Sequence, residues 1–338
     1  MATYAGIDLH SNNIYLGVID RNNERLFNKR LPNKLNIIKK ALRPYKKALV
    51  GVAVESTFNW YWLVDGLQDA GYKMHLANPS AIKQYEGIKH RDDKSDAFWL
   101  AQMLMLGILP EGYIYPKDQR STRDLLRRRL LYVQQRTAHI LSVKSMASRS
   151  LGETISTRQI KKLKPQEAHT LFTQEHLRLA CRHALATIDF LSSQIKSIEK
   201  EVMKHVKLKS EFASLLTMPG IGNILGLTIM LEVGDIRRFK RAGNYASYCR
   251  CVKSENISNE KKKGSGNRKN GNKYLAWAYV EAAHFAIRFH PKAKRFYDRK
   301  ASRTNNTVAR KALANKMARA SYYIIRDQVA YDESKMFP

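Results

Sequence analysis

The segment TYAGIDLHSNNIYLGVID, residues 3–20, predicts two β-strands joined by a tight hairpin. Both halves are rich in β-branched, aromatic and other apolar residues, and the SNN between them is typical of a turn. The run RLFNKRL (25–31) predicts a third strand. The first part of the chain therefore begins as a sheet.

Strands and helices alternate after this hairpin. Helical periodicity occurs in NKLNIIKKALRPY (33–45) and NWYWLVDGLQDAG (59–71). Apolar runs that predict strands occur in KALVGVAVE (47–55) and YKMHLANP (72–79). We expect residues 1–112 to form an α/β domain with a mixed sheet and helices on its faces.

The rest of the chain predicts an all-α region. Residues 113–207 contain two long helical patterns with few breakers, which indicate a helical or coiled-coil spacer. Residues 208–338 predict a second compact unit, closed by a basic amphipathic helix over 306–328. The apolar stretch 215–234 contains Pro219 and four glycines, so it predicts two short packed helices rather than a membrane span.

The charge balance indicates a polyanionic partner. The 338 residues include 60 Lys and Arg against 29 Asp and Glu, which gives a formal net charge of +31. Such an excess opposes compaction unless a polyanion neutralises it, and nucleic acid is the usual one. A membrane-surface protein is the rival, and no lipidation signal supports it.

The cysteines and the N-terminus bear on the compartment. Cys181, Cys249 and Cys251 are too few for a disulfide framework. Cys249 and Cys251 lack a second Cys/His pair at zinc spacing, so we expect them to be buried as small apolar residues. MATYAGIDL lacks the pattern of a secretion signal. We expect a protein of the reducing cytoplasm.

Acidic residues collect at predicted strand and helix ends. Asp8 ends the first strand and Glu55 ends the fourth. HRDDKSDAFWLA (90–101) then starts a helix, on which Asp96 shares a face with either Asp92 or Asp93. An acid at a helix start also serves as an N-cap. Four convergent carboxylates in so basic a chain nevertheless predict a site for two Mg²⁺ ions, which act on phosphodiesters.

Three of these stretches also carry a resemblance. YAGIDLH, VESTFNWYWL and RDDKSDAFWLA resemble the RuvC-like, ribonuclease-H-fold domain of the DEDD transposases. This insertion-sequence family is numbered one hundred and ten and is related to the Piv-type invertases. The resemblance implies metal ligands for Mg²⁺ or Mn²⁺ at Asp8, Glu55, Asp93 and Asp96. Asp92 stands where the family usually has threonine.

The second half resembles the same family. LLTMPGIG (215–222) has the hairpin signature of a helix–hairpin–helix unit, in which the backbone at Gly220 and Gly222 meets a phosphate; a packed hairpin without DNA is the alternative. The sequence pattern CRCV…SN…KKKG…KNGNKYLAWA is similar to that of the subgroup numbered eleven-eleven. The resemblance implies a catalytic serine at Ser258, with Ser254 and Ser265 as the alternatives.

Basic residues provide candidate contacts to nucleic acid. The segment KKKGSGNRKNGNK (261–273) is expected to be a mobile loop, since it cannot bury a core. Core packing is favoured over base stacking for Tyr245, Tyr248, Trp277 and Tyr279. The basic candidates are Arg127, Arg128, Arg129, Lys261, Lys262, Lys263, Arg268, Lys269 and Lys273.

The resemblance implies an RNA-guided DNA recombinase of the bacterial cytoplasm, associated with the nucleoid. In such an enzyme a noncoding bridge RNA pairs with donor and target DNA, a phosphoserine intermediate forms, and the subunits assemble as a dimer or tetramer. A Holliday-junction nuclease that uses water as the nucleophile is one alternative. A non-enzymatic nucleic-acid-binding protein on a degenerate ribonuclease-H fold is the other.

Overall fold

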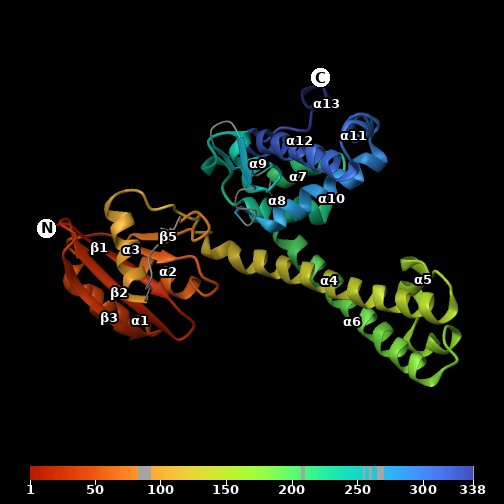
Figure 1. Cartoon of the computed structure of the whole chain (residues 1–338), viewed down its shortest axis with the longest axis horizontal. Helices are drawn as coiled ribbons and strands as arrows, with labels where there is room; N and C mark the ends of the chain where they lie inside the picture. Colours follow the sequence, from red (N-terminus) through yellow and green to blue (C-terminus); the bar gives the residue numbers. More distant parts are fainter. Residues whose placement is uncertain (83–92, 207–209, 254–255, 259–260, 265–269, 338) are drawn as a thin grey trace. The chain divides into compact units, whose positions relative to one another are not determined.

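A computed structural model describes residues 1–82, 93–206, 210–253, 256–258, 261–264 and 270–337. The chain forms two compact units, Met1–Lys117 and Asp118–Pro338 (Figure 1). The boundary expected between residues 207 and 208 falls outside the described residues. The division into three domains therefore stays a prediction.

The first unit contains the predicted mixed sheet. Its strands are β1 (Thr3–Leu9), β2 (Asn13–Asp20), β3 (Arg25–Pro32), β4 (Leu49–Glu55) and β5 (Met74–Ala77), in the order β3-β2-β1-β4-β5. The first three strands pair antiparallel, with Gly6 opposite Gly17. β4 and β5 add in parallel, with Ile7 beside Val54. The hairpin and the strand–helix alternation are thereby confirmed.

Helices cover both faces of this sheet (Figure 1). One face packs on α1 (Leu35–Leu42), which a 3₁₀ turn (Arg43–Tyr45) extends, and on α2 (Tyr61–Gln68). The other face packs on α3 (Asp93–Met105). Side chains alternate between the faces, so Ile7 contributes to the first core while Gly6 faces α3.

The second unit begins with a long antiparallel helix pair (Figure 1). Near one end Leu126 of α4 (Lys117–Leu151) packs with Val202 of α6 (Glu175–Val206), and near the other Ile140 packs with Cys181. A short helix α5 (Thr157–Lys162) and a 3₁₀ turn (Pro165–Thr170) join them. Both long helical patterns are confirmed.

The remaining elements form one helical core around Tyr245 and Tyr279. Its helices are α7 (Ser210–Leu216), α8 (Asn223–Val233), α9 (Ala242–Tyr248), α10 (Lys273–Phe289), α11 (Pro291–Arg303), α12 (Asn306–Asp327) and α13 (Glu333–Met336), with a 3₁₀ turn at Ile236–Arg238. The stretch 215–234 forms parts of α7 and α8, as predicted. Within the described residues no helix is long and apolar enough to cross a membrane.

One expectation about the basic segment is wrong. Residues 261–264 form the strand β7 (Lys261–Gly264), which pairs antiparallel with β6 (Asn256–Ser258). A two-stranded ladder needs only backbone hydrogen bonds, so a lysine run that buries no core can still form it while Lys261 and Lys263 stay exposed. The loop interpretation missed this pairing because it considered only side-chain burial.

Candidate active site

Asp8 and Glu55 lie side by side at the carboxyl ends of the neighbouring parallel strands β1 and β4. Each follows directly on the paired residues Ile7 and Val54 of the parallel strands β1 and β4. Asp8 is 6% exposed and Glu55 is partly buried. The two strand ends therefore bring two carboxylates to the same place, although they stand far apart in the sequence.

Both carboxylates lie on the face of the sheet that α3 covers. A Cβ atom on Gly6 would clash with the carbonyl oxygen of Ala97, so the α3 backbone sits directly on β1 there. Ala53 packs with Leu100 of the same helix. Because side chains alternate along a strand, Asp8 shares the face of Gly6, and Glu55 shares the face of Ala53.

The first turn of α3 lies at the same end of the sheet as these carboxylates. Gly51 lies near Leu104, and Ala53 packs with Leu100, so the helix runs antiparallel to β4. Asp96 precedes Leu100 by one turn and is partly buried. Its position on the helix therefore brings it toward the Glu55 end of the sheet.

The other acids of this segment are described only in part. Asp93 is the first residue of α3 and lies one turn before Ala97, but its side chain lies outside the described part of the structure. Asp92 lies outside it entirely. Among the described residues no group of three His, Cys, Asp or Glu side chains stands at metal-binding distances.

Three side chains that the sequence did not single out link the loops at this end of the sheet. His10 Nε2 lies 3.2 Å from Asp8 Oδ2. Asn59, which follows β4, donates from Nδ2 to the His10 carbonyl oxygen at 2.9 Å, and Asn33 donates to the same oxygen at 3.1 Å. The loops after β1 and β4 are thus linked, which fixes Asp8 relative to Glu55. The only sequence signal of His10 and Asn59 is a position just after a strand with an acidic end.

The hairpin between α7 and α8 is closely packed against α10. Gly220 has φ +86°, and a Cβ atom there would clash with the carbonyl oxygen of Ala282. Gly222 is the N-cap of α8, and a Cβ atom on it would meet nothing within 4 Å. Gly220 is therefore needed for packing, while Gly222 leaves the start of α8 accessible.

Two family models match the chain in these two regions. A model of the DEDD type, described as a transposase, matches residues 5–149, and the model of the transposase IS116/IS110/IS902 family matches residues 213–298. Together they span more than half of the chain. The chain belongs to the IS110 family of transposases. It is a DNA transposase enzyme of an insertion sequence.

Named relatives of the transposase are similar over most of their length. The probable family 20 transposase of Pseudomonas aeruginosa is 23% identical over 293 residues, which cover 83% of this chain and 85% of the relative. The transposase for insertion sequence element IS1328 of Yersinia enterocolitica is 22% identical over 337 residues, or 95% and 96% of the two chains. The transposase for IS1111A of Coxiella burnetii is 24% identical over 287 residues, or 81% and 76%.

The three arginines of the transposase at 127–129 do not form one free basic surface. Arg127 donates from Nε and Nη2 to the two carboxylate oxygens of Glu232, at 2.6 and 2.7 Å. Arg129 donates from Nε to Glu199 Oε1 at 2.8 Å. Only Arg128 is exposed. Two of the three are therefore internal ion-pair partners, which their spacing in sequence did not reveal.

Glu232 is the centre of a buried network in the second unit. It is 3% exposed, and Asn272 donates from Nδ2 to its Oε2 at 2.7 Å. The Asn272 Oδ1 in turn accepts from the backbone N–H of Tyr274 and Leu275 and caps α10. Burial alone lowers the pKa of Arg127, but the hydrogen bonds and charge of Glu232 outweigh it and hold that pKa above its ordinary value.

The structure describes only the backbone of Ser258, the predicted catalytic serine. It describes the basic segment 261–273 only in part. Ser258 ends β6 opposite Lys261, and its side chain lies outside the described part. Ser254, Ser265, Arg268 and Lys269 lie outside the described residues, as does the Lys262 side chain, while Lys261, Lys263 and Lys273 are exposed.

The predicted core residues of the transposase are confirmed. Tyr245 and Tyr279 are fully buried, with their hydroxyls 2.8 Å apart, and burial raises the pKa of both. Tyr248 and Trp277 pack against the same core. The three cysteines are free and buried, and burial raises the pKa of the Cys251 thiol to about 12.

Proposed function

We propose that this transposase is an RNA-guided, metal-dependent recombinase that cleaves and rejoins DNA through a covalent phosphoserine intermediate. The observation that carries the proposal is that Asp8, Glu55 and the first turn of α3 converge at the carboxyl ends of β1 and β4, in a chain of the transposase family. A RuvC-like first domain agrees with the mixed five-stranded sheet and with acids at the ends of β1 and β4.

The carboxylates fit Mg²⁺ or Mn²⁺. Asp8, Glu55, Asp93 and Asp96 would hold two ions, because carboxylate oxygens are the hard ligands these ions prefer. Bound there, the metals supply charge stabilisation to the attacking and leaving oxygens of a phosphodiester. His10 Nε2 lies beside this carboxylate, 3.2 Å from Asp8 Oδ2.

Ser258 is proposed as the nucleophile in the second unit. Its Oγ attacks the DNA phosphorus, a new P–O bond forms, and the bond from phosphorus to a deoxyribose oxygen breaks. The serine proton is transferred to that leaving oxygen, which becomes a free hydroxyl. Attack by a hydroxyl of another strand reverses these changes, so no bond energy is lost before rejoining.

The nucleic-acid contacts follow from charge and accessibility. The accessible N-terminus of α8 at Gly222 suits a helix–hairpin–helix contact to phosphate. Exposed lysines on and beside β7 lie close in sequence to the proposed nucleophile. We further propose a bridge RNA that pairs with donor and target DNA, a dimer or tetramer, a place in the IS1111 subgroup, and activity in the cytoplasm at the nucleoid.

A strand-transfer assay with and without copurified RNA tests the guide. RNA bound to the purified protein is sequenced, and plasmids that carry the matching donor and target sites are incubated with Mg²⁺. We expect joined products that disappear after ribonuclease treatment, and after Mg²⁺ is chelated. Undiminished joining after complete RNA removal would contradict the guide.

Two other results would point to the alternatives. Branched DNA cut without rejoining favours a Holliday-junction nuclease. Tight binding of DNA and RNA with neither cutting nor joining favours a non-enzymatic binder.

A further inference from the structure

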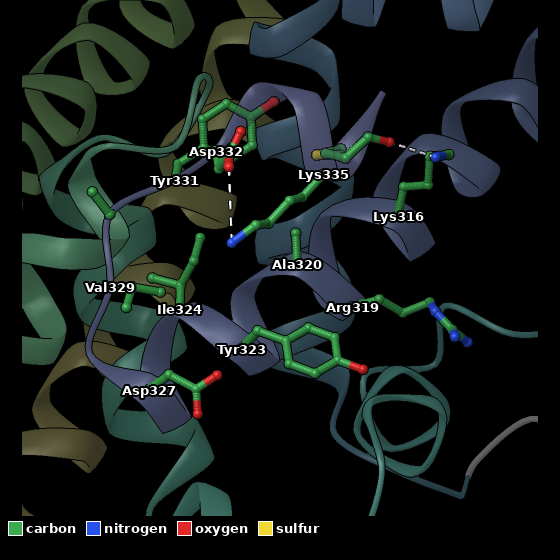
Figure 2. Close-up of a pocket in the computed structure, with 12 residues that line it drawn as sticks. Lys316, Arg319, Ala320, Tyr323, Ile324, Asp327, Val329, Tyr331, Asp332 and Lys335 are labelled. Carbon is green, nitrogen blue, oxygen red and sulfur yellow. Dashed lines mark hydrogen bonds and ion pairs between the residues drawn. The ribbon is translucent and has the colours of Figure 1, made fainter. Parts of the chain in front are cut away.

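Two adjoining hollows lie along the C-terminal half of α12. The first, with a volume of about 420 Å³, lies between α12 and the segment 329–336 (Figure 2). The second, of about 540 Å³, lies between α12 and residues 240–244 at the start of α9. Arg319 and Tyr323 line both hollows, so they form the ridge between them.

The first hollow is suited to a flat ring with polar edges. Ile324, Val329 and Met336 contribute apolar wall. In Figure 2 the Tyr323 ring lies along one side, and the Lys335 side chain extends over the interior. An apolar pocket with an aromatic wall and a few polar groups matches a nucleobase.

The far wall of the first hollow is held in place by bonds to the rest of the unit. The backbone N–H of Tyr331 donates to Thr217 Oγ1 at 2.8 Å. Lys316 Nζ donates to the Met336 carbonyl oxygen at 2.6 Å. Glu333, between these anchors, lies 2.7 Å from His290 Nε2. A ligand would therefore meet a preformed wall, which lowers the entropy cost of binding.

The second hollow is lined mainly by cations. Lys240, Arg241 and Arg319 are exposed, and no carboxylate of the described residues forms an ion pair with them. Arg326 also lines this hollow, and its Nε and Nη2 donate to the two oxygens of Asp327, an acid that lines the first hollow, at 2.7 and 2.9 Å. Uncompensated positive charge of this kind fits a phosphate.

Tyr323 is the aromatic platform between the two hollows. It is 48% exposed, although it lies on a helix whose neighbours Tyr322 and Ile324 are buried. The Arg326 guanidinium lies 5.0 Å from its ring centre. An exposed ring beside a cation stacks on unpaired bases of any sequence.

We infer that the Tyr323 ridge binds an unpaired strand of nucleic acid, with a base in the first hollow and the adjoining phosphate in the second. A duplex does not fit this arrangement, because its bases are stacked inside. The inference rests on the proposed function for its nucleic-acid partner, and it adds a binding site made of residues other than the carboxylates and Ser258.

Fluorescence anisotropy with short labelled oligonucleotides tests the site on the full chain. The probes are unpaired RNA, unpaired DNA and duplex DNA of the same length, titrated at several salt concentrations. We expect Tyr323→Ala to weaken binding of unpaired strands on the order of tenfold, and Tyr323→Phe to bind like the wild type because it keeps the ring. Duplex binding should change little, and the RNA and DNA arms identify the preferred strand.

Charge is tested separately. Arg319→Ala should lower the slope of log affinity against log salt by about one, whereas Arg178→Ala, an exposed arginine on α6, should leave it unchanged. Circular dichroism melts verify that each variant folds. The inference is overturned if Tyr323→Ala binds unpaired strands as well as Tyr323→Phe does, or if it loses duplex binding equally.

These outcomes separate the inference from the proposed function. A wild-type chain that joins no DNA but shows Tyr323-dependent binding retains the inference and removes the recombinase. A chain that recombines, but whose Tyr323→Ala variant binds unpaired strands normally, retains the recombinase and removes the inference.

Discussion

Strand transfer by the Asp8→Asn variant should fall on the order of 10³-fold. Asp8 is almost fully buried at the end of β1, beside Glu55 and on the face covered by α3. The amide keeps the shape of the carboxylate but loses the negative charge that holds a divalent ion. Metal stabilisation of a phosphodiester transition state contributes several kcal/mol, and each 1.36 kcal/mol corresponds to about tenfold in rate.

The matched control is Asp20→Asn. Asp20 is also buried in this sheet, but it pairs with Thr3 at the opposite end of β1. Its Oδ1 accepts hydrogen bonds from the backbone N–H of Asn22 and Glu24. An asparagine oxygen can accept the same bonds, so near-normal strand transfer is expected. Single-turnover rates of both variants at saturating Mg²⁺ make the comparison. A wild-type rate in Asp8→Asn would remove Asp8 from the metal site.

The Arg127→Met variant should lose about 3 kcal/mol of unfolding free energy in the second unit. The Glu232 side chain is 2% exposed, so removing Arg127 leaves a buried carboxylate without its cation. Breaking a buried pair in this way typically costs about 3–5 kcal/mol. We take the lower end because the Arg127 side chain is 29% exposed, and the stacking of its guanidinium 4.6 Å from the Tyr274 ring centre is also lost.

Urea unfolding of the wild type and three variants measures this coupling. Glu232→Gln should cost less than Arg127→Met, since Arg127 can still reach water. The double variant Arg127→Met/Glu232→Met should recover much of the loss, because no unpaired charge remains. Equal stability of Arg127→Met and the wild type would show that the ion pair contributes nothing to folding.

The sheet of the first unit was predictable because local patterns determine it. Alternation and apolar runs located β1 to β5, and strand ends placed Asp8 and Glu55 at neighbouring positions. The close contact of α3 at Gly6 was not predictable, since a glycine in a strand does not reveal which backbone approaches it. That contact is what brings the first turn of α3 to the carboxylates.

In the second unit, the sequence-based predictions mainly missed pairs of residues that lie far apart in the sequence. Arg127 and Glu232 are 105 residues apart, and nothing in either local pattern names the other. The available signal was Glu232 itself, a single acid in an apolar stretch, which indicates a buried and paired carboxylate. The β6–β7 pairing was missed for a similar reason, because lysine-rich strands carry no apolar alternation.

The choice of Asp93 over Asp92, and of Ser258 over Ser254, came from the resemblance and not from spacing. Helix geometry allows Asp96 to pair with either aspartate. A serine near a basic segment has no distinguishing pattern of its own. Both choices stay predictions, and variants of each pair can be compared in the strand-transfer assay.

Detection of a covalent protein–DNA adduct tests the central claim most directly. The transposase is mixed with its RNA, end-labelled donor DNA and Mg²⁺, then denatured and resolved by electrophoresis. The account predicts a labelled protein band in the wild type and in Ser254→Ala, with phosphate attached to the peptide that contains Ser258, and no band in Ser258→Ala. An undiminished adduct and full strand joining in Ser258→Ala would contradict it.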